Sequence, residues 1–337
     1  MMNKTRRRSA RITWSEITAL VVLIVMLQVA PRAAAAAERL RVAHSTLTAT
    51  NSVLWVARDR GIFPRHGLDV SLIYVAGVRS MQALLAQEVE IGSVSGTTAI
   101  QANLSGADSV IIAGISNSVL MSLVATPDIG TVEALRGKRL GVTRFGSLSD
   151  FMARSQLLRA GVTPDRDVAI LQTGGYPESV AAMQAGGIQA AMLSPPYHTI
   201  AIRRLGFREL IDLSRTTKYQ SNALVTLRRF AQSKPAVLTA FMEAYTEAVR
   251  VFKQEPEFTL GVLGRAMRSN DRQILEETYG FYRDYFAEIP QPTLDGIQLI
   301  LDELAPRTPK AREARPQDFV DLRFVQALDG ARGKKSP

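Results

Sequence analysis

The chain has 337 residues, of which 46% are hydrophobic and 21% are charged, so it can form two packed domains and is not a disordered or fibrous protein. Its net charge of +10 resides mostly at the two ends, because the first 37 residues hold six basic side chains against one acid and the last seven hold three more. The part between them carries only +2, which excludes a binder of nucleic-acid phosphates, and the absence of cysteine excludes thiol catalysis and thiolate metal sites.

The first 37 residues have the three parts of a secretory signal peptide. A basic segment spans residues 4–11, an apolar stretch spans residues 17–27, and small residues occupy positions 33–37. We expect cleavage after Ala37 and a mature protein in the periplasm. Because the chain has no cysteine to receive a lipid, we expect that protein to be unlipidated.

After the leader, apolar strands alternate with amphipathic helices, which is the pattern of parallel sheets with helical crossovers. Asn51 is expected to begin a helix that continues to Arg60 and stops at Gly61, and Ser80 is expected to cap the helix after the second strand. The strands of this first block are expected at residues 40–44, 69–75, 91–94 and 110–113, and a further helix at residues 97–104.

The same alternation repeats after Pro127, where Ser147 is expected to open a long helix that ends at Gly161. The expected strands of this second block are residues 140–143, 168–172, 190–193 and 210–212, and its other helices are residues 178–185 and 197–205. A strand at residues 223–227 then precedes a helical tail with helices at residues 235–254, 257–267 and 272–286.

Two α/β blocks followed by helices predict two lobes, with the tail packed on the first lobe. We expect the chain to cross between the lobes at residues 122–130 and 214–221, and two such crossings form a hinge. Open α/β sheets bind ligands at the carboxyl ends of their strands, which places the site in the cleft between the lobes. The expected segments are 38–125 and 218–330 for the first lobe, 126–217 for the second lobe, and 331–337 for a basic tail.

The sequence shows no pattern of a common active site. His44, His66 and His198 are scattered, without the spacing of metal ligands. The glycines of residues 130–138 are too far apart for a phosphate-binding loop, and residues 92–96 have Val94 where a hydrolase would have its nucleophile. We therefore expect a protein that is not an enzyme and that holds no cofactor and no metal.

A short polar or glycine-rich turn instead follows each strand and precedes a helix. Helix amino termini present unpaired N–H groups, so such turns around one cleft can hold an anion without a lysine, although Ser, Thr and Gly are also common caps and turn residues. Tyr74, Tyr176 and Tyr197 could stack on a flat ligand. The candidate binding residues are Ser45, Thr46, Ser95, Thr97, Ser116, Arg144, Gly146, Ser147, Gly174, Tyr176, Ser194 and Tyr197.

Several segments together resemble a known family. Residues 55–70 read WVARDRGIFPRHGLDV, residues 82–96 read QALLAQEVEIGSVSG and residues 135–142 read LRGKRLGV. Further matching segments lie at residues 161–170, 183–192, 193–197 and 318–328. In this order and spacing they resemble the periplasmic substrate-binding proteins of ABC importers of the nitrate, sulfonate, taurine and thiamine-pyrimidine type. Glu88, Glu90 and Gln189 depart from the family pattern, so no function of those positions is carried over.

The resemblance implies a periplasmic binding protein fold of type II, in which two α/β lobes close on a small molecule. It implies capture of a small organic anion such as a sulfonate, delivery to an inner-membrane ABC permease, and a monomeric protein. A pyrimidine or other aromatic heterocycle as ligand, and a sensory role, stay open as alternatives. A related branch contains pyrimidine synthases with a cysteine-rich iron site, and the lack of cysteine together with the leader disfavours that branch.

Overall fold

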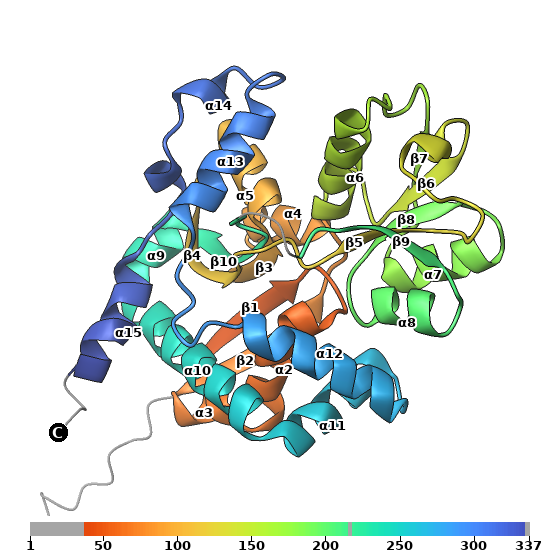
Figure 1. The fold of residues 1–337 in the computed structure, drawn as a ribbon. Helices are drawn as coiled ribbons and strands as arrows, with labels where there is room; N and C mark the ends of the chain where they lie inside the picture. Colours follow the sequence, from red (N-terminus) through yellow and green to blue (C-terminus); the bar gives the residue numbers. More distant parts are fainter. Residues whose placement is uncertain (1–36, 215–217, 334–337) are drawn as a thin grey trace, which may run out of the picture. The chain divides into compact units, whose positions relative to one another are not determined.

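Two five-stranded sheets form the framework of the computed structural model, which describes residues 37–214 and 218–333 (Figure 1). The expected leader lies outside these ranges except for Ala37, and so does most of the expected basic tail, residues 334–337. One compact unit, Glu38–Pro337, contains every element described below. None of the helices in the described ranges has both the length and the apolar composition that crossing a membrane requires.

The first sheet has the order β2-β1-β3-β10-β4, and the second has the order β7-β6-β8-β5-β9. In each sheet four strands run in the same direction, and one strand that follows a crossing runs antiparallel between its two neighbours: β10 in the first sheet and β5 in the second. The strands are β1 (Glu38–His44), β2 (Leu68–Tyr74), β3 (Ile91–Ser95), β4 (Ser109–Ser116), β5 (Ser122–Ala125), β6 (Arg139–Val142), β7 (Ala169–Gln172), β8 (Ala190–Leu193), β9 (Arg208–Asp212) and β10 (Asn222–Leu227).

Helices cover both faces of the two sheets. They are η1 (Ala49–Asn51), α2 (Ser52–Asp59), α3 (Ile62–Arg65), α4 (Arg79–Leu85), α5 (Gly96–Leu104), η2 (Glu133–Leu135), α6 (Leu148–Arg159), α7 (Tyr176–Gln184), α8 (Tyr197–Arg203), α9 (Arg228–Ser233), α10 (Pro235–Gln254), α11 (Pro256–Met267), α12 (Arg272–Tyr285), α13 (Leu294–Leu304), α14 (Lys310–Glu313), η3 (Pro316–Phe319) and α15 (Arg323–Gly333).

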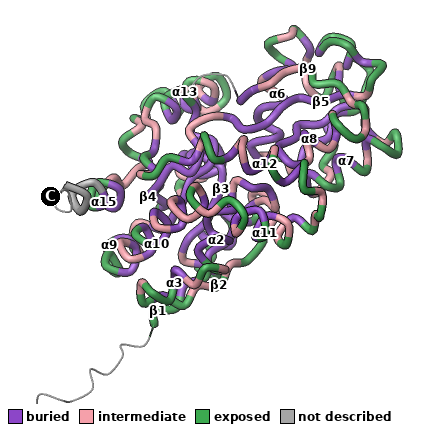
Figure 2. Tube along the Cα trace, turned by 60° about the horizontal axis from the view of Figure 1, so that its bottom comes forward, coloured by how far each residue is buried: buried purple, intermediate pink, exposed green. Residues whose placement is uncertain are grey.

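The period-two alternation of strand side chains divides the core into layers. In β1, Leu40 and Val42 pack in the cluster that α2 and α10 complete, whereas Ala43 belongs to the cluster under α4, α5 and α13. In β8, Met192 shares the latter cluster with residues of α6, and Leu193 faces α7 and α8 on the other side. Figure 2 shows buried positions running through the strands of both sheets, with exposed positions outside.

The predicted first crossing is wrong, because Ser122–Ala125 forms β5, which lies between β8 and β9 of the second sheet. The chain passes from the first sheet to the second at residues 117–121. All four residues of β5 are buried and paired on both sides, so its stability comes from distant strands rather than from a local pattern. The chain returns to the first sheet between the end of β9 at Asp212 and the start of β10 at Asn222.

Two further expectations need correction. Ser80 does not cap a helix, because α4 begins one residue earlier and the Ser80 hydroxyl donates to the carbonyl oxygen of Val75. The helical tail packs on the first sheet through α10, as expected, but it also contacts helices of the second sheet. Arg204 of α8's C-terminal end pairs with Asp271 at 2.7 Å, and residues of α6 contact α13.

Candidate functional site

A cavity that opens to solvent lies at the strand ends of both sheets, with about 550 Å³ of space when the solvent at its mouth is included. Twelve of its eighteen lining residues are serine or threonine, and none of the eighteen is charged. Hydroxyl groups can donate hydrogen bonds to an anion without a nearby cation, so the lining suits a polar ligand whose charge is spread over several oxygens. The lining residues are Ser45, Thr46, Thr48, Thr50, Gly77, Ser95, Thr98, Ser116, Leu120, Met121, Thr143, Ser147, Leu148, Ser149, Tyr176, Ser194, Ser221 and Asn222.

On the side of the first sheet, the cavity meets the amino terminus of α5. Ser95 ends β3 and caps this helix, since its hydroxyl accepts a hydrogen bond from the Thr98 N–H at 3.1 Å. The first turn of α5 contains no acidic residue. The partial positive charge of this helix end is therefore not offset by its own sequence.

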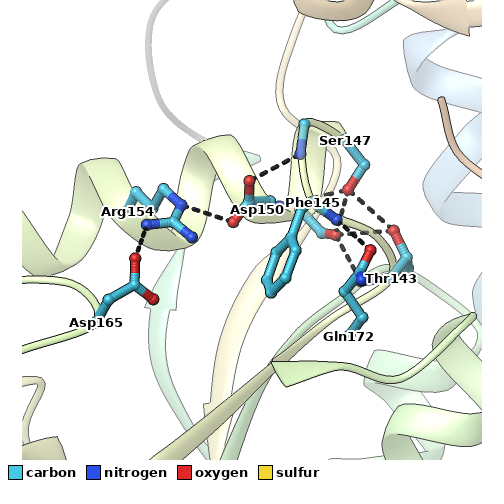
Figure 3. Close-up of polar contacts among 9 residues, drawn as sticks. Thr143, Phe145, Ser147, Asp150, Arg154, Asp165 and Gln172 are labelled. Carbon is cyan, nitrogen blue, oxygen red and sulfur yellow. Dashed lines mark hydrogen bonds and ion pairs between the residues drawn. The ribbon is translucent and has the colours of Figure 1, made fainter. Parts of the chain in front are cut away.

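On the side of the second sheet, three hydroxyls form a closed cluster at the start of α6 (Figure 3). The Thr143 Oγ1 lies 3.0 Å from the Ser147 Oγ and 2.9 Å from the Ser149 Oγ, and the two serine oxygens are 2.9 Å apart. Each hydroxyl has one proton to donate, so in the absence of a ligand these groups bond one another. Rotation about the C–O bonds would turn those protons toward an anion in the cavity.

The acidic residue in the first turn of α6 is tied back and does not line the cavity. Asp150 accepts hydrogen bonds from the Gly146 N–H at 2.8 Å and from the Arg154 Nε at 2.8 Å, and Arg154 also pairs with Asp165 at 2.5 Å (Figure 3). Arg154 therefore compensates the negative charge at this end of α6.

Asn222, the first residue of β10, contributes a buried donor without an acceptor. Within the described ranges its side-chain Nδ2 has no hydrogen-bond partner, and the residue is only 8% exposed. An unpaired buried amide N–H costs free energy comparable to a lost hydrogen bond. A ligand oxygen that accepts a hydrogen bond from this group would remove that cost.

A second cavity of about 410 Å³ adjoins the first and shares Ser45, Thr46, Gly77, Thr143 and Tyr176 with it. Its remaining lining residues are mostly aromatic or apolar: Leu47, Tyr74, Gly174, Gly175, Pro177, Glu178 and Tyr197. The Tyr176 and Tyr197 rings are stacked, with centroids 6.3 Å apart and planes at 24°. Burial raises the pKa of all three tyrosines, so they are neutral near pH 7.

The structure places nine of the twelve candidate residues on the walls of these two cavities. Ser45, Thr46, Ser95, Ser116, Ser147, Tyr176 and Ser194 line the first cavity, and Gly174 and Tyr197 line the second. No ligand contact tests them, so their role in binding stays a prediction.

The other three candidates do not line either cavity. The Thr97 hydroxyl lies 2.9 Å from that of the buried Tyr219 and points away from the cavity. One step along a helix turns a side chain by about 100°, and Thr98 is the residue that lines the cavity. Gly146 lies beside the cavity, where its carbonyl oxygen accepts from the Thr98 hydroxyl at 3.4 Å. Arg144 packs its aliphatic part on Gly77.

Sequence reasoning missed several lining residues, of which Asn222 is the most informative. It stands at the start of its strand, and a site at the carboxyl ends of parallel strands would not include it. Because β10 is antiparallel to β3, its first residue pairs with Ser95, at the same edge of the sheet. A prediction of strand direction would have been needed to find it.

No group of three His, Cys, Asp or Glu residues within the described ranges is arranged to hold a metal ion. His44 is buried at the end of β1, where its Nδ1 lies 3.0 Å from the Thr46 carbonyl oxygen. Burial lowers the pKa of His44, so the ring is neutral near pH 7. The neutral ring packs between Trp55 and Tyr74.

Comparisons with known proteins agree with this architecture. A family model described as NMT1/THI5 like matches residues 49–258. A Bacillus subtilis (strain 168) protein named for binding aliphatic sulfonates is 22% identical over 236 residues, which cover 67% of this chain and 69% of that protein. A solved structure from Bordetella bronchiseptica RB50 superposes with a TM-score of 0.79 at 18% identity, covering 88% of this chain and 98% of that one. The periplasmic nitrate-binding protein NrtA from Synechocystis PCC 6803 gives a TM-score of 0.72 at 13% identity, covering 89% of both chains. The expected fold, two α/β halves as in periplasmic binding proteins, is confirmed.

Proposed function

Since this chain belongs to the NMT1/THI5-like family and has the fold of periplasmic binding proteins, we propose that it is the solute-binding component of an ABC importer. It captures a small organic anion with a sulfonate-like head in the cavity between its two sheets and delivers it to a membrane permease. The relatives named for sulfonate and for nitrate both take oxyanions, which supports this class of ligand.

The observation that carries the proposal is the combination of twelve lining serine and threonine hydroxyls with the unpaired Asn222 donor, in a cavity whose described lining residues carry no charge. An oxyanion accepts several hydrogen bonds at once, and donors held around a helix amino terminus bind it without a lysine or arginine. The end of α5 offers such a terminus with no acid in its first turn. The sulfonate head therefore lies between the α5 terminus and the hydroxyl cluster of α6.

The same arrangement gives the protein an open state and a closed state, in which the two sheets lie closer together around the ligand. Walls from both sheets surround the cavity, so a bound ligand contacts both and favours their approach by its differential affinity. With β5 in the second sheet, we place the boundary of the first lobe at residues 117–121 instead of 125. The second lobe then ends at the crossing after Asp212.

The remaining features of this proposal come from the sequence. The leader directs the chain to the periplasm, where it acts as a monomer and performs no catalysis. Its partners are the ligand and an inner-membrane permease. The second candidate ligand, a flat nitrogen heterocycle, is favoured by one observation, the stacked pair of Tyr176 and Tyr197 beside the cavity.

Isothermal titration calorimetry of the exported protein tests the proposal. We expect binding of ethanesulfonate, butanesulfonate or nitrate, and no binding of butylammonium. Replacing Asn222 by Asp exchanges a donor for a negative charge and should weaken sulfonate binding by at least about tenfold, the value of one hydrogen bond to a charged group. Asn270→Asp adds the same charge at an exposed position outside the cavity and should leave the affinity unchanged.

Two results contradict the proposal. One is that no anion of the panel binds. The other is that the Asn222→Asp protein binds sulfonate as tightly as the unmodified chain, with thermal unfolding in the absence of ligand showing that both variants are folded. A panel that binds only pyrimidines or other heterocycles favours the second candidate.

A further inference from the structure

The second cavity differs in chemistry from the first, although the two share five lining residues. The first is lined mainly by hydroxyl groups, whereas the second is lined by three tyrosines, by Leu47 and Pro177, and by one carboxylate, that of Glu178. A ligand whose head lies in the first cavity would extend its other end into the second. The side chains that line the second cavity therefore indicate which chemical group the other end of the ligand carries.

Among the residues that the structure describes, Glu178 is the only charged one that lines either cavity. Within the described part of the chain, no Lys, Arg or His nitrogen lies within ion-pair distance of its carboxylate. Asp150, at the equivalent place in α6, is instead paired with Arg154 at 2.8 Å. The negative charge of Glu178 is thus not compensated by an ion pair, and the residue is exposed at the cavity mouth.

Glu178 also decides which helix end can hold an anion. It is the third residue of α7, and its Oε2 lies 2.5 Å from the place where a side chain at Gly175 would begin, so the carboxylate is folded over the first turn of its own helix. A carboxylate there occupies the region that a ligand oxyanion would need. The oxyanion is therefore directed toward α5 and α6, and the α7 side is left for a positive group.

The tyrosines make the same region favourable for a cation. Tyr74 reaches it from β2 of the first sheet, and Tyr176 and Tyr197 reach it from the first residues of α7 and α8. Burial raises the pKa of Tyr74 and of Tyr197, and the nearby Glu178 carboxylate raises both further. Aromatic faces attract alkylammonium groups, most strongly where water is partly excluded.

Among the described residues, Arg144 is a cation close enough to this region to act on Tyr74. Its side chain packs on Gly77, its buried Nε has no hydrogen-bond partner, and its charge opposes the effect of Glu178 on the pKa of Tyr74. It lines neither cavity and forms no ion pair with Glu178 in the described structure. Arg144 therefore leaves the carboxylate available to a ligand.

We propose that Tyr74, Tyr197 and Glu178 form a second subsite for a tertiary or quaternary ammonium group, so that the preferred ligand is a zwitterion with an oxyanion at its other end. This inference rests on the proposed function, because it needs the oxyanion in the first cavity. The inference adds the orientation of the ligand. Its anionic head lies at α5 and α6, and its cationic end lies between the first turn of α7 and Tyr74.

A matched pair of ligands separates the two subsites in calorimetry. The zwitterion 3-(trimethylammonio)propane-1-sulfonate and the anion 4,4-dimethylpentane-1-sulfonate have the same shape and differ only by nitrogen in place of carbon. We expect the zwitterion to bind about tenfold more tightly, which corresponds to a cation held by aromatic faces and a carboxylate. Glu178→Gln should lower the ratio of the two affinities several-fold, because the carboxylate is lost and the tyrosine faces remain, while leaving the affinity for the neutral-tailed sulfonate unchanged.

Two controls make the result specific. Glu88→Gln removes a negative charge from an exposed position away from both cavities and should keep the tenfold ratio. Glu178→Lys should reverse the ratio, so that the neutral-tailed sulfonate binds better. Since Glu178 is exposed, neither change at this position should unfold the protein.

The outcomes are distinguishable. If both sulfonates bind equally, or if Glu178→Gln preserves the tenfold ratio, the second subsite is overturned while the proposed function stands. If neither sulfonate binds, the proposed function itself has failed and the subsite falls with it. A ratio near ten that falls only in the Glu178 variants establishes the subsite.

Discussion

Ser147 acts both as a helix cap and as a wall of the candidate cavity. Its hydroxyl accepts from the Asp150 N–H at 3.5 Å, which caps α6, and the same oxygen lies in the hydroxyl cluster with Thr143 and Ser149. A serine cap contributes about 1 kcal/mol to stability, so Ser147→Ala would lower the free energy of unfolding even without a ligand. The same substitution also removes a hydroxyl from the cavity wall, so its effects on stability and on binding have to be measured separately.

Alanine at Ser147 together with Tyr197 should weaken binding without unfolding the protein. The variant loses one donor to the anion and one aromatic wall, so its affinity should be lower by at least about tenfold. Calorimetry with the tightest-binding sulfonate measures this change. Urea unfolding should show a loss of about 1 kcal/mol from the missing cap. Ser105→Ala, at an exposed position remote from the cavity, is the control, and an unchanged affinity of the double variant would mean that the cavity is not the binding site.

At the scale of elements, the second crossing is held between two helices at glycine positions. A side chain at Gly96, the first residue of α5, would begin 2.1 Å from the Gln220 carbonyl oxygen, and one at Gly296 of α13 would begin 2.6 Å from the Gln220 N. Such distances require backbone movement. The amino terminus of α5 thus keeps its place at the cavity because Gly96 allows close approach of the crossing.

This packing makes Gly96→Ala destabilising. We expect the free energy of unfolding to fall by about 2 kcal/mol, the typical cost of overpacking a closely packed position, as measured by urea unfolding without ligand. Gly280→Ala is the matched control, because a side chain there meets open space in the middle of α12, and it should raise stability by about 0.5–1 kcal/mol. Equal effects of the two substitutions would contradict the assigned role of Gly96.

At the scale of the whole unit, Glu303 of α13 joins the helical tail to the second sheet. Its Oε1 lies 3.4 Å from the Arg159 Nη2 and 3.5 Å from the Ser155 Oγ, both on α6, and its carboxyl also faces Tyr219 in the second crossing. Burial raises the pKa of this carboxyl above its ordinary 4.5, with Arg159 acting in the opposite direction.

The raised pKa predicts a pH dependence of stability. The folded protein holds the Glu303 proton more tightly than the unfolded chain, so this contribution is fully present below pH 4.5 and is lost as the pH rises through the folded pKa. Glu303→Gln removes the titration, so the unfolding free energy of the unmodified protein minus that of the variant should decrease from pH 4 to pH 7. Urea unfolding across this range measures the difference, and a constant or rising difference would contradict the burial of this group.

Patterns that depend on neighbouring residues were predicted well. The strand at residues 190–193 and the helix at residues 235–254 are observed with the predicted bounds, and Ser147 caps α6 as expected. Nine of the candidate binding residues lie on the walls of the two cavities, because a polar turn between a strand and a helix is a local signal, and their role in binding stays a prediction. Thr97 was chosen instead of Thr98 because a single helical step cannot be resolved without the position of the helix on its sheet.

The sequence by itself determined the alternation of strands and helices, the repeat of two α/β blocks and the polar turns, since each depends on residues a few positions apart. Only the tertiary structure decided that β5 belongs to the second sheet and that β10 runs antiparallel, because strand pairing joins residues far apart in the chain. Those two pairings place Asn222 opposite Ser95 and bring walls of both sheets around one cavity. The polar character of the candidate site was therefore visible in the sequence, whereas its geometry arose from long-range hydrogen bonding.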